Sequence, residues 1–262
     1  MLKTKHLILL GVAAFIIFLI VSAPAAIITS TVERYTPVRF HLVSGSVWHG
    51  AAASMRLPGI SLGPISWRIR PLSLFRGALA ANLDIDSTNS SASDIHGNAF
   101  VEASFFGNVG VEDAILSADA EWLFTQAAIP AAASGTFELQ IEKLSMNLSD
   151  PLPQIKGVLK WKNAAVTYPE IHKLGEYQVV LDYDSSDEHP VEVIKGDIKD
   201  INSPLQIQGT ALLYTSYRYI LDVNVNATDD APGDLKRVVP LLGTRNDDGA
   251  VNIRRQGLLK DL

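Results

Sequence analysis

The residue types best suited to catalysis meet in one short stretch, the Ser-Gly-Ser-Val-Trp-His-Gly run of residues 44–50. A serine nucleophile needs a base within hydrogen-bond reach and an acid that orients the base. Ser46 and His49 are three positions apart in a segment with the pattern of a strand, so their side chains are expected on opposite faces. Neither the G-x-S-x-G turn of hydrolases nor the G-x-x-x-x-G-K-[ST] phosphate-binding loop occurs. The stretch therefore does not indicate a catalytic triad.

Metal-binding patterns are equally sparse. None of the six histidines stands at the spacing of a local metal pair, and the absence of cysteine excludes thiolate metal sites, disulfides and cysteine nucleophiles. The fold could still gather His41, His49 and Glu33 into one site, although solvated strand histidines are far more common. Asn246–Gly249 resembles part of a calcium loop but lacks the glutamate at the twelfth position, which favours a hairpin turn. We therefore expect no metal, no cofactor and no enzymatic activity.

The four tryptophans offer two alternatives. They could line an aromatic ligand cleft, or they could fill the core between a sheet and short helices, where each would bury about 200 Å². The second interpretation is favoured, because filling a core is the commoner use of so large a side chain. The residues are Trp48, Trp67, Trp122 and Trp161.

Alternation of apolar and polar residues dominates the chain beyond residue 36. One apolar and one polar face per strand is typical of antiparallel rather than parallel sheets. The sequence therefore predicts a mainly β fold, a curved and mostly antiparallel sheet with a few short helices. The clearest alternating runs are Ile65–Ile69, Leu79–Ile85, Phe137–Ile141, Val179–Tyr183, Leu205–Ile207, Tyr217–Val225 and Val251–Ile253.

Helical patterns are few. The spacing of apolar residues predicts a helix over 114–128, and a second, short or kinked at Pro240, is expected between Asp230 and Gly243. Residues 71–77 allow one turn at most. The polar stretches 87–93 and 182–190 are short enough to be hairpin connections, so no boundary divides the β region into separate domains.

Charge and hydropathy exclude two further classes. The net charge of −6 comes without a basic cluster outside the chain ends, whereas a nucleic-acid-binding protein would be expected to carry a basic stripe. Only Leu7–Ile28 is strongly apolar, so a polytopic membrane protein is excluded.

The amino terminus predicts an anchor. A helix over residues 7–28 would rise about 33 Å, enough for a hydrocarbon core of about 30 Å. Lys3 and Lys5 precede it, which favours residues 1–6 in the cytoplasm and residues 29–262 on the exported side. A leader cleaved after Ala25 is the alternative, since Ala23-Pro24-Ala25 has the small-x-small form. The apolar run continues past that point to Ile28, which favours a retained anchor.

Two tryptophan motifs carry a family resemblance. Residues 45–50 read G-x-V-W-x-G, and residues 62–77 read L-G-x-x-x-W-x-I-x-P-x-x-L-F-x-G. In this order, with the glycines that follow, they resemble the type II secretion system protein N family (general secretion pathway protein N) of Gram-negative bacteria. The matching positions are Gly45, Trp48, Gly50, Gly63, Trp67, Pro71, Gly77, Gly157, Trp161, Gly175, Gly209, Gly243, Gly249 and Gly257.

The resemblance implies a non-enzymatic accessory component of the cell inner membrane with a periplasmic domain, serving protein export across the outer membrane. Its partners would be other components of the secretion system. The matching residues are interpreted as structural, with glycines in tight turns or close contacts and tryptophans in the core.

Two functions remain open. An interaction protein would meet its partners through exposed edge strands. A lipid- or amphiphile-handling protein, similar in architecture to the AsmA-like group, would instead use an open apolar groove. The inner face of the sheet discriminates between them: a trough filled by Trp67 and Trp161 favours the first function, and an unfilled trough favours the second.

Overall fold

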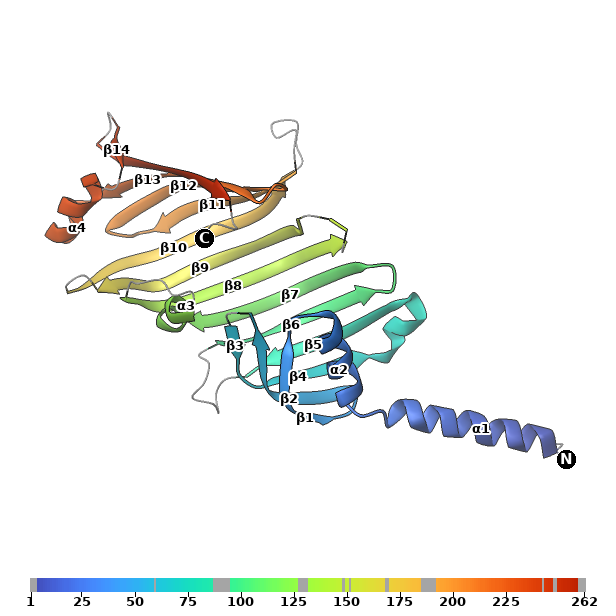
Figure 1. The fold of residues 1–262 in the computed structure, drawn as a ribbon. Coiled ribbons are helices and arrows are strands. Elements are labelled where there is room, and N and C mark those ends of the chain that lie inside the picture. The colour runs from blue at the N-terminus through green and yellow to red at the C-terminus, as the bar shows by residue number, and fades with distance from the viewer. Residues whose placement is uncertain are drawn as a thin grey trace.

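The computed structural model describes residues 4–58, 60–86, 95–126, 132–147, 149–150, 152–167, 170–184, 192–241, 243–246 and 249–258. Within them, one sheet of 15 strands takes up most of the chain, and short helices lie against it (Figure 1). Among the described residues, every strand pair from β4 to β13 is antiparallel, so the predicted mainly β, antiparallel fold is confirmed. The predicted loop 87–93 lies outside the described residues.

Strands that are neighbours in the sheet are mostly neighbours in sequence, so most connections are hairpins. The order across the sheet is β1-β2-β4-β5-β6-β7-β8-β9-β10-β11-β12-β13-β15-β14, with β3 paired to β2. The strands are β1 (Arg39–Gly45), β2 (His49–Leu57), β3 (Ile60–Leu62), β4 (Ile65–Arg70), β5 (Ala78–Ile85), β6 (Ile95–Ser104), β7 (Asn108–Asp119), β8 (Ala132–Asn147), β9 (Gln154–Thr167), β10 (Ile171–Asp184), β11 (Val193–Ile201), β12 (Leu205–Tyr214), β13 (Arg218–Ala227), β14 (Thr244–Arg245) and β15 (Val251–Leu258). The helices are α1 (Thr4–Val21), α2 (Ala26–Tyr35), α3 (Ala120–Gln126) and α4 (Gly233–Val238), with 3₁₀ turns η1 (Pro71–Arg76) and η2 (Val239–Leu241).

The register aligns small and apolar side chains into rows that cross the sheet. Side chains of directly paired residues share a face, so the pairings can be followed from strand to strand. One row is formed by Val43, Ala52, Ile65, Ile85, Gly97, Leu116, Leu139, Leu159, Val179, Ile198, Gly209, Val223 and Ile253. The adjacent row consists of the neighbouring residue in each strand and therefore lies on the other face of the sheet. It begins with Ser44, Ala51, Ser66, Asp84 and Asn98 and is mostly polar.

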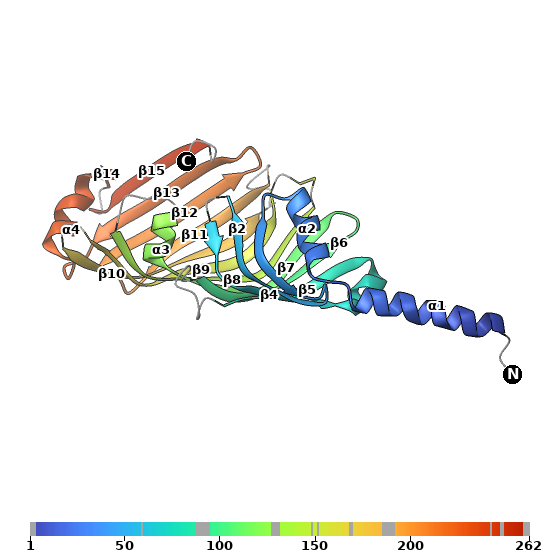
Figure 2. The same ribbon diagram turned by 60° about the horizontal axis from the view of Figure 1, so that its bottom comes forward.

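The sheet curls toward its apolar face. Phe40 of β1 and Trp67 of β4 meet edge to face, with ring centroids 6.5 Å apart, although β2 lies between their strands. Register shifts in the pairs β6–β7, β8–β9 and β9–β10 mark irregularities that bend strands and increase twist. The sheet is therefore curved like a trough, as Figure 2 shows. We call its concave, apolar side the inner face and its convex, polar side the outer face.

Three clusters of buried side chains occupy parts of the inner face. One joins Ala25 and Ile28 to Trp67 at the amino-terminal end, and the others centre on Tyr177 and on Val251. Between them the apolar rows remain half-buried, for example at Leu116, Leu139, Leu159 and Val179. The inner face is therefore covered near both ends and less completely in the middle.

The predicted helix over 114–128 is wrong in its first part. Residues 114–119 belong to β7 and pair with β6 and β8 on both sides, which places Ala114 and Ala118 on the buried face. Pairing with two neighbours outweighs the weak helical spacing. Only α3 is helical, and Asp119 caps it by accepting a hydrogen bond from the Glu121 backbone N–H at 2.8 Å. Residues 127–128 lie outside the described part of the chain.

The helix predicted between Asp230 and Gly243 is confirmed, since α4 continues into η2, which contains Pro240. Residues 71–77 exceed the single turn predicted, because η1 is a 3₁₀ segment of 6 residues, about two turns, ended by Gly77 in the left-handed conformation. The hairpin turn predicted at Asn246–Gly249 joins β14 to β15, where the Gly249 N–H donates to the Asn246 carbonyl at 3.0 Å. Asp247 and Asp248 themselves are outside the described residues.

The apolar run 7–28 is divided between two helices. α1 ends at Val21, Pro24 forms an isolated antiparallel bridge with Ser46, and α2 begins at Ala26. Among the residues that the structure describes, no helix has the length and apolarity required to cross a membrane.

Candidate functional site

The first tryptophan motif forms the tight turn between β1 and β2. Gly45 pairs with Gly50, and the Ser46 N–H donates to the His49 carbonyl at 2.8 Å. Gly45 has φ +84°, and a Cβ there would lie 2.4 Å from the His49 carbonyl oxygen. The turn therefore requires glycine at this position.

The second motif locks this turn from the inner face. The Trp67 side chain is 8% exposed, and its indole N–H donates to the Val47 carbonyl at 3.1 Å. A Cβ on Gly50 would lie 2.3 Å from Cζ2 of Trp67. The indole therefore rests directly on the Gly50 backbone, a contact that leaves no space for a side chain.

The locked turn in turn holds the chain that leaves α1. The Val47 N–H donates to the Ala23 carbonyl at 2.8 Å, and the Ala25 N–H donates to the Gly45 carbonyl at 3.1 Å. The Trp48 indole N–H donates to the Ile20 carbonyl in the last turn of α1, at 2.9 Å. We call this arrangement the anchor clamp: Ile20, Ala23 and Ala25 held by Gly45, Val47, Trp48, Gly50 and Trp67.

α2 extends the clamp along β1. Ala25 is 1% exposed, and the Glu33 carboxylate accepts a hydrogen bond from the Phe40 N–H at 2.7 Å. The Arg39 guanidinium donates to the Glu33 carbonyl at 2.8 Å. Glu33 thus ties α2 to the start of the sheet.

The serine and histidine singled out in the sequence form no catalytic arrangement. The prediction that they share one strand is wrong, because β1 ends at Gly45 and β2 begins at His49. Ser46 lies in the turn between them, where its Oγ accepts from the His49 backbone N–H at 3.2 Å. Glu33 contacts β1 through Phe40 instead of forming a ligand group with His41 and His49. Among the described residues, no three His, Asp or Glu side chains gather as metal ligands.

The other motif residues are spread along the sheet. Trp161 stacks on Phe137 with centroids 5.1 Å apart and lies 6.1 Å from Tyr177, whose hydroxyl donates to the Leu205 carbonyl at 2.8 Å. The remaining positions are Gly63 before β4, Pro71 and Gly77 at the two ends of η1, Gly157 in β9, Gly175 in β10, Gly209 in β12, Gly243 before β14, Gly249 in the last turn and Gly257 in β15.

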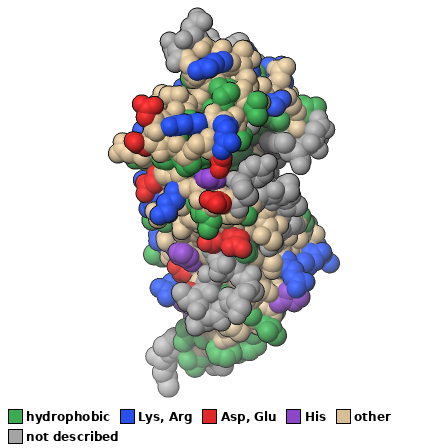
Figure 3. Space-filling view, turned by 90° about the vertical axis from the view of Figure 1, so that its left-hand side faces the viewer, with side chains coloured by type: hydrophobic (Ala, Val, Ile, Leu, Met, Phe, Trp, Pro, Cys, Tyr) green, Lys and Arg blue, Asp and Glu red, His purple; other side chains and the backbone are tan. Residues whose placement is uncertain are grey.

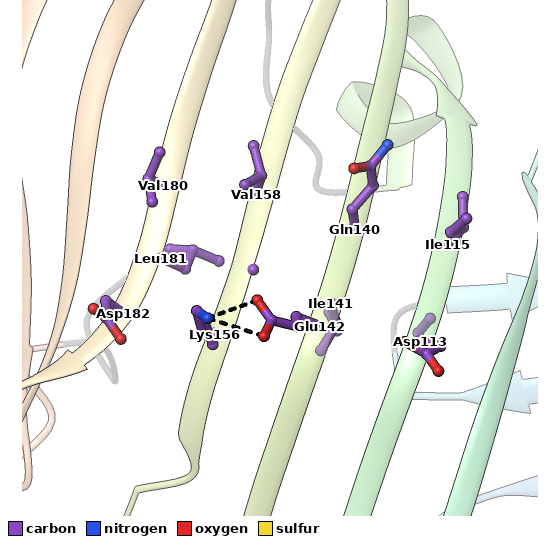
Figure 4. A pocket seen from close by; sticks show the side chains of 12 residues that line it. Asp113, Ile115, Gln140, Ile141, Glu142, Lys156, Val158, Val180, Leu181 and Asp182 are labelled. Carbon is purple, nitrogen blue, oxygen red and sulfur yellow. Dashed lines mark hydrogen bonds and ion pairs between the residues drawn. The ribbon is translucent and has the colours of Figure 1, made fainter.

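A hollow of about 440 Å³ spans β7 to β10, and an ion pair of Lys156 and Glu142 lies in it (Figure 4). There Lys156 lies 2.8 Å from Glu142, and this hydrogen bond raises the pKa of Lys156. Similarly, Lys162 lowers the pKa of Glu138, and burial raises the pKa of Tyr177 to about 12. General acid–base catalysis uses groups with pKa values near the working pH. In all these groups the pKa moves away from neutrality, so the arrangement suits structure rather than proton transfer.

Replacing Gly50 by alanine tests the lock between the two motifs. The new methyl group would overlap the Trp67 ring, so Gly50→Ala is expected to lower the free energy of unfolding by about 1–3 kcal/mol. Gly233→Ala is the matched control, since a Cβ at Gly233 meets no atom within 4 Å. Urea unfolding of the full chain in detergent gives both values. In a Trp67→Leu background the loss at Gly50 should shrink, and an unchanged loss would contradict the contact.

The chain is similar to known proteins over most of its length. The sequence model of the family described as "Type II secretion system (T2SS), protein N" matches residues 36–254. The chain is 24% identical over 268 residues to "Type II secretion system protein N" of Aeromonas hydrophila, covering 97% of this chain and 99% of that protein. It is also 24% identical over 241 residues to the protein of that name from Vibrio cholerae serotype O1, with 92% of each chain covered. No solved structure matches. The resemblance seen in the sequence is thus confirmed, and the chain belongs to the type II secretion system protein N family, whose members are components of that secretion system.

Proposed function

We propose that this chain is a non-enzymatic accessory component of the type II secretion system that takes part in protein export across the outer membrane. Its amino-terminal helix would hold it in the cell inner membrane, and its sheet would lie in the periplasm. The observation that carries the proposal is the anchor clamp, in which residues of the two tryptophan motifs fix the end of α1 to the sheet. A rigid joint at this place is useful where the helix positions the domain.

The surface of α1 supports an anchor. Its large apolar side chains are exposed at successive positions from Leu7 to Leu10 and from Phe18 to Val21, so they cover every side of the helix. A helix that is apolar all round needs an apolar environment, whereas a helix lying on a surface keeps one polar face. We place the span within residues 7–28, with residues 1–6 in the cytoplasm and residues 29–262 in the periplasm, and we infer that it ends where the clamp begins.

The clamp also supports retention of this segment. Cleavage after Ala25 would remove the Ile20 and Ala23 carbonyls. The Trp48 indole N–H and the Val47 N–H would then lose these acceptors. A chain that keeps its amino-terminal segment avoids this loss.

Partner strands could join the sheet at its carboxyl-terminal edge. β14 pairs only with Val251 and Asn252 of β15, so among the described residues the rest of that edge carries no strand. Backbone groups on such an edge suit strand addition by another protein. We propose other components of the secretion system in the inner membrane and periplasm as these partners.

The proposed topology predicts the behaviour of a fused reporter. Alkaline phosphatase, which is active only in an oxidising exported compartment, is expected to be active when joined after Leu262. The same reporter joined after residue 6 should stay inactive. Activity measured in intact cells distinguishes the two positions, and an inactive fusion at Leu262 with full protein levels would overturn the topology.

The export role predicts a secretion defect. Host cells that lack this chain should release less of a type II cargo protein into the medium and retain more in the periplasm, and the full chain should restore release. Immunoblots of the medium and periplasm measure the distribution. Gly233→Ala should complement fully, whereas normal release without the chain would contradict the proposal.

A second function, AsmA-like handling of a lipid or amphiphile, is favoured by one observation. Trp67 and Trp161 fill parts of the inner face, but the apolar row beside them is half-buried, including Leu159 and Val179. This uncovered strip offers an apolar surface that an acyl chain would match.

A photoreactive residue separates this second function from the first. Val179 lies on the inner face and Val180 on the outer face of the same strand, and both are half-buried. Benzoylphenylalanine placed at Val179 in the full chain should form a lipid adduct in cells, and at Val180 it should not. Mass spectrometry of the purified chain detects the adduct. Equal labelling at both positions, or none at Val179, would remove the lipid function.

A further inference from the structure

Four large apolar side chains stand in solvent at one place on the sheet. Leu72 and Phe75 in η1 are 78% and 89% exposed, and Phe105 and Phe106 in the turn from β6 to β7 are 69% and 83% exposed. Clusters of exposed large apolar side chains mark sites that bind another protein, a membrane or a ligand. We call these four residues the apolar tip.

The two segments of the apolar tip are neighbours. Ala78 pairs with Ser104, and the Phe105 N–H donates to the Gly77 carbonyl at 3.0 Å. A Cβ on Gly77 would lie 3.8 Å from the Phe106 ring. The 3₁₀ turn and the hairpin turn therefore form one continuous protrusion.

A buried serine holds the protrusion in place. Ser73 is 1% exposed, and its hydroxyl donates to the Arg70 carbonyl at 2.7 Å and accepts from the Ala80 N–H at 3.0 Å. This pair of hydrogen bonds fastens η1 to β4 and β5. Exposure of Leu72 and Phe75 is thus fixed by the fold and does not arise from a loosely held segment.

Basic side chains lie directly beside the apolar tip. A hollow of about 680 Å³ extends from His49, at the start of β2, to η1. Its lining includes Arg68, Arg70 and Arg76. All three arginines are exposed. Arg70 donates to Asn82 at 3.0 Å, and Arg76 lies 3.4 Å from Glu102, a solvent-exposed pair that stabilises little.

The apolar tip lies at the same strand ends as the root of α1. The Ile69 N–H, just before η1, donates to the Trp48 carbonyl in the clamp turn at 2.8 Å. Figures 1 and 2 both show η1 and the β6–β7 turn on the side from which α1 leaves the sheet. Figure 3 shows the opposite side, where acidic and basic side chains are interspersed.

We propose that the apolar tip and its arginines contact the surface of an anionic membrane, the one in which α1 is anchored. This inference rests on the proposed anchor and adds a second contact to it. Aromatic and leucine side chains would enter the interface between headgroups and acyl chains, and the guanidinium groups would meet lipid phosphates. A membrane is favoured over a protein partner because the tip continues, through the clamp, into a helix that is apolar on every side.

Fluorescence quenching in vesicles tests the contact. The chain lacks cysteine, so Phe75→Cys, Phe105→Cys, Phe15→Cys and Ile171→Cys each give one labelling site for nitrobenzoxadiazole. Ile171 is the matched control, since it is 70% exposed but lies at the opposite strand ends. The labelled full chains are reconstituted into vesicles of phosphatidylethanolamine and phosphatidylglycerol that contain a lipid with a nitroxide near its headgroup.

The expected result is quenching at Phe75 and Phe105 that is about twofold or more stronger than at Ile171. Replacing phosphatidylglycerol by phosphatidylcholine, or adding Arg68→Gln with Arg76→Gln, should weaken it. Quenching at Phe15 alone would uphold the anchor and overturn the tip contact. Quenching at Phe75 and Phe105 without quenching at Phe15 would uphold the tip contact and overturn the anchor. A blue shift at Phe75 without lipid quenching would mean contact with a second copy of this chain and would also overturn the membrane contact.

Discussion

A single sheet with one apolar face has no second layer to bury that face, and this constraint shapes the whole molecule. Two-layer domains solve the problem by packing one sheet or helix layer on another. Here the sheet curls toward its apolar side until Phe40 reaches Trp67 across an intervening strand, and α2, α3 and α4 contribute side chains to its buried or aromatic clusters. These contacts leave the apolar strip through Leu159 and Val179 only half-buried.

The anchor clamp solves a different problem at the end of the same sheet. A helix joined to a domain by a flexible linker fixes only the distance between them, whereas hydrogen bonds on both sides of the joint also fix direction. The clamp turn receives the Trp67 indole on one side and holds the carbonyls of Ile20 and Ala23 on the other. Because Gly50 has no side chain, the indole can lie on the backbone and bring these two sets of contacts together.

Much of the fold was predictable from local sequence, because alternation specifies strands and their hairpin order requires no distant information. The helix expected over 114–128 was wrong since pairing with β6 and β8, which the local pattern does not contain, decided its first part. The motif residues were interpreted as structural, but the contacts of the clamp were not predictable. Its acceptors at Ile20 and Ala23 are backbone carbonyls, which every residue carries. Likewise, Leu72 and Phe75 resemble core residues in sequence, and only the turn geometry exposes them.

The position of α1 constrains how the two open functions could operate. α1 and the apolar tip both lie at the same ends of the strands, with α1 at the corner beside the edge strand β1 (Figure 1). If both meet one membrane, the strands point toward the bilayer, and the apolar rows, which cross the strands, run along its surface. A trough in this orientation would carry a lipid beside the membrane rather than away from it. The free edge of β15 would then stand to one side of the anchor, where neighbouring components in the same membrane could reach it by lateral diffusion. This geometry gives the interaction function the simpler physical route.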